Sequence, residues 1–263
     1  MTRTPRVLSI AGSDSGGGAG IQADLKAFAA AGVHGMTAIT AITAQNTVGV
    51  TAVHAIPPRI IIEQVKTVAD DIGVDAVKIG MLGDQPTIEA VAKALDLIPE
   101  APVVIDPVMV SESGARLLGE HAVGELRDLL LPRAAVVTPN VPEALVLVGG
   151  NRKEPAELAE EIRLFGPKAV VVTGGHREQA IDTFYDGEQL VEIPGPRFSD
   201  GAAHGSGCTH SSTLAAWLAR GATPLEAARE AKSAASAAVR DGLRDIGAGP
   251  GPVDVLGQTS RLS

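Results

Sequence analysis

Residues 75–105 read DAVKIGMLGDQPTIEAVAKALDLIPEAPVVI and contain one complete unit of the fold. Apolar residues dominate both ends of this segment, over 75–81 and 102–105, and recur at helical spacing between them. Asp84 is placed to cap the helix, and Pro86 suits its first turn. The segment therefore predicts a strand, a helix and a second buried strand.

The same alternation continues in both directions along the chain. Helical patterns follow most of the further buried strands, which are predicted at residues 6–10, 35–43, 134–137 and 168–172. Near-continuous apolar strands that alternate with helices indicate a mostly parallel sheet covered by helices on both faces. We find no linker and no internal repeat, and we therefore expect one α/β domain over residues 1–263.

The last third of the chain adds elements of other kinds. Two extended runs around Asp186 and Gly187 predict a hairpin over residues 180–193. A final helix is expected to begin at the capping box of residues 223–226. The tail from Gly247 onward is rich in glycine and proline, and we expect it to pack loosely.

Composition excludes several classes of function. The chain has 22 basic and 31 acidic residues, a formal charge of −9 and no basic run, which argues against a nucleic-acid partner. A single cysteine cannot form an intrachain disulfide, and no apolar stretch is long enough to span a bilayer. We therefore expect a cytoplasmic protein without membrane or nucleic-acid contacts.

Polar and acidic residues follow the predicted strands. Asp106 comes directly after the strand at 102–105, and Asn140 with Glu143 follows the next strand. Ligands of a parallel sheet bind beyond the carboxyl ends of its strands, so the two acids are expected to face one crevice. A few separated oxygen ligands suit Mg²⁺ held largely through water and a substrate phosphate. Taken singly, each acid is more simply explained, Asp106 by a turn and Glu143 by the first turn of a helix.

A second candidate site lies at residues 203–213, which read AHGSGCTHSST and lead into an apolar helical pattern. Gly205 and Gly207 let the backbone approach a ligand closely, and the free N–H groups of a helix start bind anions. Cys208 lies at this helix start, where the helix dipole is expected to lower the pKa of its thiol. The alternative is an ordinary turn followed by a buried core cysteine.

Residues 11–20 form a glycine-rich loop between a predicted strand and a predicted helix. The chain contains no Gly-Lys-Ser/Thr run, so the loop is not a Walker A motif. It also lacks the acidic residue that follows a dinucleotide-binding loop at a fixed spacing. Asp14 and Asp24, which flank the glycines, still favour a binding loop over a plain surface turn.

These residues leave three classes of function open. Carboxylates, a metal and backbone N–H groups fit phosphoryl transfer, with Cys208 as the base or a polar substitute for it. A thiol acyltransferase would instead use Cys208 as a nucleophile together with His204 or His210. A non-catalytic sensor of a small molecule could use the same crevice.

Residues 10–24, IAGSDSGGGAGIQAD, closely resemble the opening signature of the hydroxymethylpyrimidine and phosphomethylpyrimidine kinases of thiamine biosynthesis, within the ribokinase-like superfamily. Five later motifs resemble those of the family in the same order, namely TAQNT at 43–47, KIGML at 78–82, DPVM at 106–109, TPNVPE at 138–143 and HGSGCT at 204–209. The resemblance implies a three-layer α/β/α sandwich, usually homodimeric, that transfers the γ-phosphoryl group of ATP. The acceptor would be the hydroxymethyl group of an aminopyrimidine, and then its monophosphate.

The resemblance also implies roles for single residues. Gln45 would hydrogen-bond the edge of the pyrimidine and Met81 would pack on its face, within a pocket shared with Gly12, Ala19 and Asp24. The remaining assignments are an anion hole with the catalytic positions at Gly205, Ser206, Gly207 and Cys208, Mg²⁺ at Asp106 and Glu143, and nucleotide contacts at Asn140, Thr173 and Gly175.

Two departures from the family pattern concern the nucleotide. Thr173 stands where the family commonly has lysine, so a cation expected near the ATP phosphates is missing. Residues 199–203 replace a more basic lead into the HGSGCT motif. We expect a Mg²⁺-ATP-dependent pyrimidine kinase, with a pyridoxal or pyridoxine kinase of the same fold as the nearest alternative and a pyrimidine-binding sensor as the alternative from another class.

Overall fold

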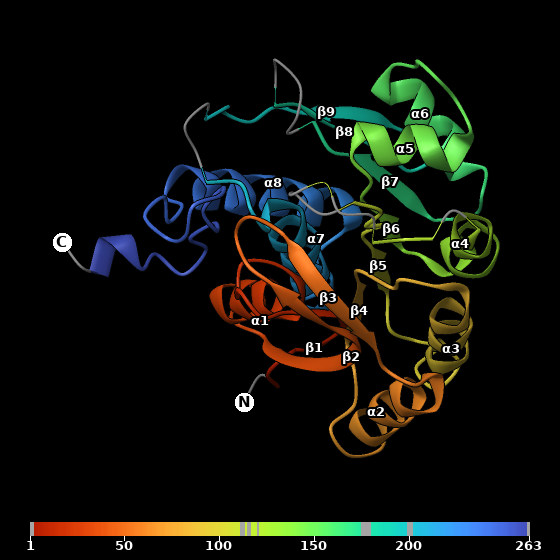
Figure 1. Cartoon of the computed structure of the whole chain (residues 1–263). Coiled ribbons are helices and arrows are strands. Elements are labelled where there is room, and N and C mark those ends of the chain that lie inside the picture. Colours follow the sequence, from red (N-terminus) through yellow and green to blue (C-terminus); the bar gives the residue numbers. More distant parts are fainter. Residues whose placement is uncertain are drawn as a thin grey trace.

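The centre of the molecule is a nine-stranded sheet (Figure 1), seen in a computed structural model that describes residues 3–110, 114, 117–119, 121–174, 180–198 and 202–261. The strands lie in the order β3-β2-β1-β4-β5-β6-β7-β8-β9. Their bounds are β1 Arg6–Asp14, β2 His34–Gln45, β3 Val50–Ala55, β4 Ala76–Ile79, β5 Val103–Ile105, β6 Val136–Val137, β7 Ala169–Val172, β8 Asp182–Tyr185 and β9 Leu190–Ile193.

The sheet is mostly parallel, as predicted. β2, β1, β4, β5, β6 and β7 pair in parallel, whereas β3 at one edge and β8 and β9 at the other are antiparallel. Because all the central strands run in one direction, their carboxyl ends meet along one edge of the sheet. Any ligand site of the kind predicted must lie there.

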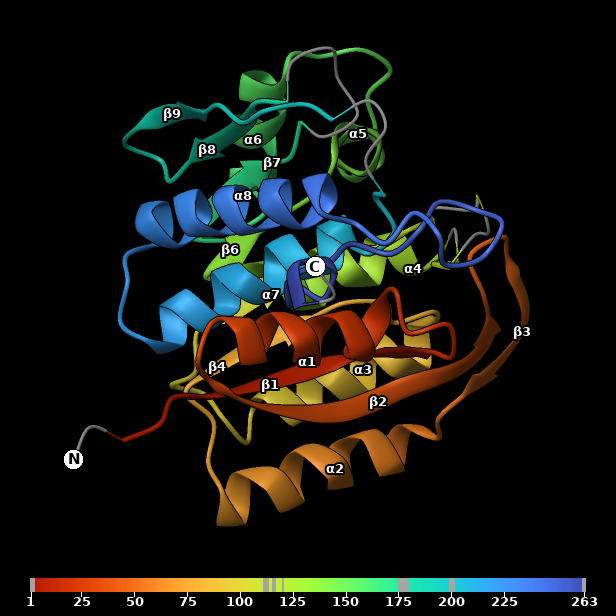
Figure 2. The ribbon, with the colours of Figure 1, turned by 90° about the vertical axis from the view of Figure 1, so that its left-hand side faces the viewer.

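Helices cover both faces of the sheet, which confirms the three-layer sandwich. Figure 2 shows α1, α7 and α8 side by side over one face, and buried residues of these three helices pack into one apolar cluster with the sheet. The other helices pack into a second cluster on the opposite face. The bounds are α1 Gly20–Ala30, α2 Pro58–Asp71, α3 Gln85–Leu95, α4 Ala122–Glu125, α5 Val141–Val148, α6 Pro155–Arg163, α7 Ser206–Ala219 and α8 Pro224–Arg240.

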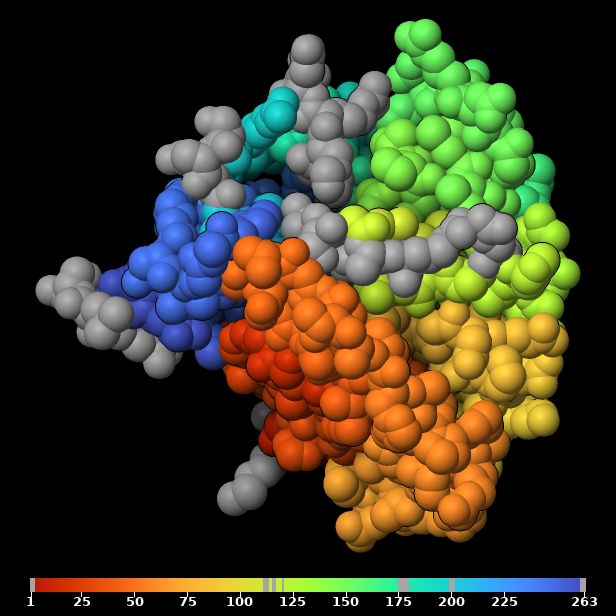
Figure 3. Space-filling model, viewed as in Figure 1, coloured from red at the N-terminus to blue at the C-terminus, as the bar shows by residue number. Residues whose placement is uncertain are grey.

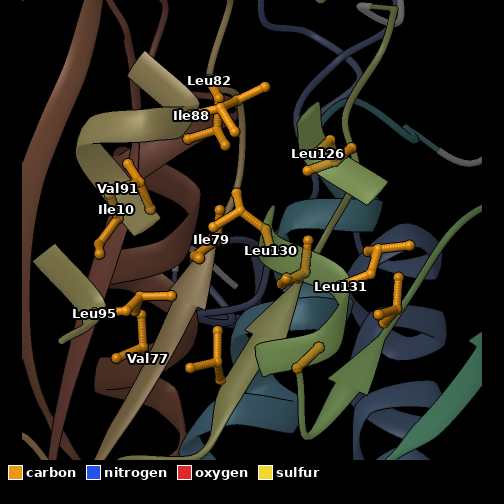
Figure 4. Packing of buried hydrophobic residues seen from close by; sticks show 14 of the residues in the cluster. Ile10, Val77, Ile79, Leu82, Ile88, Val91, Leu95, Leu126, Leu130 and Leu131 are labelled. Atoms are coloured by element: carbon orange, nitrogen blue, oxygen red, sulfur yellow. The ribbon is translucent and has the colours of Figure 1, made fainter. Parts of the chain in front are cut away.

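β4 shows how successive side chains of one strand point into the two different helical layers. Val77 and Ile79 point toward α3 and pack against Ile88 and Val91 (Figure 4). The intervening Lys78 therefore points to the opposite face, toward α1 and α7. A lysine is thus buried in the layer that carries the glycine-rich loop and the HGSGCT motif.

Helix starts follow the predictions closely. Asp84 caps α3 by accepting a hydrogen bond from Thr87 N at 3.0 Å. Thr223 and Glu226 form the predicted capping box at the start of α8. The helical pattern after residue 122 is less regular than expected, because α4 continues as a π-helical turn over Leu126–Leu130 and then a 3₁₀ turn over Leu131–Arg133.

The prediction that the C-terminal tail packs loosely is wrong. Val253 is 5% exposed, and its N–H donates to His204 O at 3.1 Å. A Cβ on Gly249 or Gly251 would overlap the backbone of Thr47 or Leu243, so these glycines permit close packing instead of looseness. Figure 3 shows the C-terminal region (blue) directly beside the β2 and β3 region (orange).

Within the described residues, no helix is both long enough and apolar enough to cross a membrane.

Candidate active site

A pocket with a volume of about 430 Å³ lies at the carboxyl ends of the parallel strands. It collects most of the residues that the sequence singled out. Gly175, one of the expected nucleotide contacts, lies outside the described residues, as do His176 and residues 199–201. The candidates that line the pocket are Gly12, Ala19, Gln45, Met81, Asp106, Asn140, Glu143, Thr173, Gly205, Ser206, Gly207 and Cys208.

One end of the pocket is built by the ends of β1 and β2 and by Met81. A Cβ on Gly12 would overlap the Met81 side chain, so the glycine leaves the methionine its place beside the pocket. Gln45 Oε1 accepts from Thr43 Oγ1 at 3.1 Å, while the side-chain N–H groups of Gln45 have no partner among the residues described. This end therefore offers an apolar face and an amide donor to a flat, polar ring.

The glycine-rich loop is shaped by a single carboxylate. Asp14 Oδ1 accepts from Gly16 N at 2.8 Å, and its Oδ2 accepts from Gly18 N and Ala19 N at 3.0 and 2.8 Å. His204 Nε2 lies 3.1 Å from the same Oδ2. Burial alone would raise the pKa of Asp14, but these hydrogen bonds outweigh it and lower the pKa. Asp14 thus fastens the loop to the segment that precedes α7.

The start of α7 meets the glycine-rich loop at backbone distance. Gly205 is the N-cap residue of α7, with φ of 84°, and a Cβ on it would overlap Gly18 O. No side chain caps α7 in the part of the chain that is described. Ser206 N–H donates to Ala203 O at 3.0 Å, whereas the N–H groups of Gly205, Gly207 and Cys208 have no partner among the described residues and are available to an anion in the pocket.

The expectation that the helix dipole lowers the pKa of Cys208 is wrong. Burial raises the pKa of the thiol to about 12, and the Asp24 and Asp106 carboxylates also raise it. Lys78 and a hydrogen bond from Gly20 N lower the pKa, but by less. Cys208 is therefore a neutral thiol near pH 7, which weakens its candidacy as a nucleophile or as a proton acceptor.

The two acids expected at a metal site do lie together. Asp106 accepts from Ser211 Oγ at 3.0 Å, and Glu143 forms a capping box with Asn140 at the start of α5. Burial raises the pKa of Glu143 to about 8, to which the Asp106 charge contributes. Burial also raises the pKa of Asp106, against the opposing charge of Lys78. Two desolvated carboxylates that repel each other are a fitting donor set for a divalent cation.

The other end of the pocket contains Asp182 and Lys232, two residues that could not be singled out from the sequence. Asp182 Oδ1 accepts from Gly174 N at 3.0 Å and from Lys232 Nζ at 2.7 Å, while His210 Nε2 lies 3.1 Å from Asp182 Oδ2. Thr173 bridges Asn140 from the neighbouring strand end. The only sequence signals for Asp182 and Lys232 were an acid inside a predicted strand and a lysine in an alanine-rich helix.

The histidines near Cys208 do not act as its partners. His204 lies against Asp14 and His210 against Asp182, each at 3.1 Å. A cysteine–histidine pair requires a histidine nitrogen directed at the thiol. The arrangement therefore gives no support to the thiol acyltransferase.

Asp24 lies behind the pocket wall, although the resemblance placed it in the acceptor pocket. Its side chain is fully buried and accepts from Lys78 Nζ at 2.9 Å, Ser212 Oγ at 2.7 Å and Ser9 Oγ at 2.5 Å. All of these partners are protein groups. Asp24 therefore supports the site from beneath and does not line the pocket in this structure.

A parallel three-layer sheet with an uncapped helix start facing two strand-end carboxylates defines a kinase of the ribokinase-like class. The chain belongs to the family described as phosphomethylpyrimidine kinase, whose sequence model matches residues 14–254. A hydroxymethylpyrimidine/phosphomethylpyrimidine kinase of Rhizobium meliloti is 49% identical over 257 residues, which cover 95% of this chain and 96% of the relative. The enzyme of the same description from Bacillus subtilis is 41% identical over 255 residues, covering 95% of this chain and 94% of the relative.

Solved structures give the same fold. The ADP complex of a Bacillus subtilis pyridoxal kinase superposes with a TM-score of 0.89 at 38% identity, covering 99% of this chain and all of that one. A phosphomethylpyrimidine kinase from Clostridium difficile superposes with a TM-score of 0.78 at 40% identity, covering 88% of this chain and 97% of that one.

Proposed function

We propose that this chain, acting as one kinase domain, transfers the γ-phosphoryl group of ATP to 4-amino-5-hydroxymethyl-2-methylpyrimidine and to its monophosphate. The observation that carries the proposal is the pocket in which a free helix start, two buried carboxylates and the Gln45–Met81 end face one another. Family membership supports the same substrates, because the relatives described above are named for both of them.

The acceptor end would fix the ring. The free amide of Gln45 would donate to a ring nitrogen, and Met81 would pack against the ring face beside Gly12. A ring held in this way would present its hydroxymethyl group to the start of α7, where Cys208 and Gly207 border the pocket. As a neutral thiol, Cys208 would contact the hydroxyl group without removing its proton.

The start of α7 would stabilise the group in transfer. Phosphoryl transfer passes through a loose transition state, so catalysis depends mainly on positioning and on groups that bind the spread negative charge. The free N–H groups of Gly205, Gly207 and Cys208 are fixed in place by the contact of Gly205 with Gly18. They require no rearrangement as the charge develops.

Asp106 and Glu143 would hold Mg²⁺ at the carboxyl ends of the strands. Their proximity and desolvation fit a divalent cation, and Asn140 orients Glu143 through the capping box. When bound, the ion would neutralise charge on the ATP phosphates. Asn140 and Thr173, with Gly175, would border the nucleotide.

The nearest second candidate is a pyridoxal kinase. The observation in its favour is the TM-score of 0.89 with pyridoxal kinases, one of them solved with pyridoxal and an ATP analogue. A pyridoxal ring also carries a hydroxymethyl group and would fit the same amide and thioether. From the family resemblance we further propose that the protein is cytoplasmic and forms a homodimer. Light scattering of the purified protein checks the dimer.

A coupled assay of ATP consumption separates these functions. Hydroxymethylpyrimidine, its monophosphate and pyridoxal are each offered with Mg²⁺-ATP, and Asp106→Asn serves as the inactive control. We expect both pyrimidines to be phosphorylated with a kcat/KM well above that for pyridoxal. Preference for pyridoxal would favour the second candidate, and saturable pyrimidine binding without ATP consumption would indicate the sensor.

A further inference from the structure

Lys78 is a buried cation at the floor of the pocket. Its side chain is 0% exposed, and its Nζ donates to Asp24 Oδ1 at 2.9 Å. The same side chain borders the pocket beneath Cys208 and Asp106. Burying an ammonium group carries a large desolvation cost, so its place here calls for a reason beyond packing.

The partner of Lys78 connects four elements of the fold. Asp24 belongs to α1 and accepts hydrogen bonds from Ser9 on β1, Lys78 on β4 and Ser212 on α7. The preceding residue of α7, Ser211, donates to Asp106 Oδ2 at 3.0 Å. The first turns of α7 are therefore held from two sides by buried carboxylates, with Lys78 next to both of them.

The charge of Lys78 acts on more than its hydrogen-bond partner. It favours the ionised forms of Asp106 and Cys208, and the carboxylates of Asp24 and Asp106 in turn raise the pKa of Lys78. Lys232, another lysine on the pocket wall, is held by Asp182 at the opposite end. The ammonium group of Lys78 thus lies near the two carboxylates of Asp24 and Asp106. All three groups lie beneath the start of α7, which is proposed to bind the phosphoryl group.

We propose that Lys78 is a positioning residue for phosphoryl transfer, whose fixed charge beneath α7 offsets the negative charges of Asp24 and Asp106. Without this cation, the charge of Asp24 would be uncompensated and that of Asp106 would be offset only by the Mg²⁺ proposed above, so more negative charge would face the phosphoryl group entering the anion hole. In a dry site such charge is poorly screened, so its effect on the transition state is large. The inference rests on the proposed kinase function.

Three variants separate this role from that of a purely structural ion pair. Lys78→Met removes the cation, Asp24→Asn keeps the cation beside a neutral partner of the same shape, and the double variant leaves neither charge. A structural pair predicts that both single variants are equally harmful and that the double variant recovers both stability and kcat. Our proposal predicts that kcat falls more in Lys78→Met than in Asp24→Asn.

We expect kcat to fall on the order of 100-fold in Lys78→Met, as for the loss of one transition-state donor. Asp24→Asn should lose no more than about 10-fold, and the KM for the pyrimidine should change little in either variant. The double variant should regain the urea midpoint of the wild type but only part of its kcat, because Asp24 no longer carries a charge while Asp106 still lacks the cation beside it. Recovery of the full wild-type kcat in the double variant would overturn the proposal.

Ser212→Ala is a milder second test, because it frees α7 from Asp24 but keeps both charges. We expect it to retain kcat within about threefold, and a loss as large as in Lys78→Met would show that geometry matters and charge does not. Binding of the ATP analogue AMP-PCP, which carries the γ-phosphoryl group, is measured in parallel by calorimetry and should weaken in Lys78→Met but not in Ser212→Ala. If wild-type protein phosphorylates no acceptor, the proposed function fails, whereas an equal affinity for AMP-PCP in all variants would refute the role of Lys78 alone.

Discussion

Cys208 shows how burial can reverse an effect that is read correctly from sequence. A helix start favours a thiolate, and the sequence places the cysteine there without ambiguity. The sequence does not reveal that the thiol is desolvated and faces Asp24 and Asp106, which together raise its pKa to about 12. The free backbone N–H groups of the first turn remain available to an anion, whatever the protonation state of the thiol.

The raised pKa of Cys208 predicts the pH dependence of its alkylation. Near pH 7 the thiolate fraction should be about a thousandfold smaller than in an ordinary thiol, because each pH unit below the pKa reduces it tenfold. Iodoacetamide labelling should therefore be very slow at neutral pH and should rise about tenfold per pH unit up to at least pH 9. Protein unfolded in urea is the control and should label rapidly. A labelling rate that levels off below pH 8 would contradict the raised pKa.

For residues at strand ends, a place in the pocket could be predicted from the sequence. For residues buried between the sheet and a helix, such as Asp24, it could not. Gln45, Met81 and Asp106 follow strands whose ends the sequence marks well, and all of them reach the pocket. Asp24 could not be placed, because its direction depends on how α1 sits on β4 and on which face Lys78 occupies. These are relations between segments far apart in the chain, and no local pattern encodes them.

At the scale of elements, the alternation of strands and helices was enough to predict a parallel sheet with two covered faces. Strand and helix ends shifted by a few residues, because tertiary pairing decides where an element stops. The irregular end of α4 had no clear signal other than Pro132, which lies in the 3₁₀ turn. The contact between the glycine-rich loop and α7 was also beyond prediction, although both segments were recognised separately.

Gly205 is the point at which these two segments touch, and replacing it tests their contact. Gly205→Ala places a Cβ at positive φ and against Gly18 O, which should cost about 2–5 kcal/mol of unfolding free energy and most of the activity. Gly124→Ala is the matched control, because Gly124 lies in α4 with no heavy atom within 4 Å of an added Cβ. It should stabilise the protein by about 0.5–1 kcal/mol and leave kcat unchanged. Urea unfolding and the coupled assay measure both, and equal behaviour of the two variants would exclude the close contact.

At the scale of the whole molecule, three distant segments meet at one edge of the pocket. Gly18 leaves room for the His204 ring and for Pro252, and His204 pairs through its backbone with Gly251 and Val253. The tail that looked loose from its composition therefore supports the histidine that pairs with Asp14. Its glycines mark places where backbones approach one another, a meaning that composition alone cannot distinguish from flexibility.

This arrangement predicts that weakening the tail inactivates the enzyme before it unfolds. Val253→Ala removes buried methyl groups and should cost about 1–2 kcal/mol. Because the tail segment has few other buried apolar side chains, it should detach locally and release His204 while the sheet remains intact. Val48→Ala is the control, since Val48 is 59% exposed and should change stability by less than about 0.5 kcal/mol.

The measurement compares two midpoints in urea, one for kinase activity and one for far-ultraviolet circular dichroism. In wild type and Val48→Ala the two should coincide, because detachment of the tail and unfolding of the sheet are then one transition. In Val253→Ala the activity should be lost at a lower urea concentration than the helical signal. Coincident midpoints in Val253→Ala would mean that the tail unfolds together with the sheet, and that the pocket does not depend on the tail as a separate support.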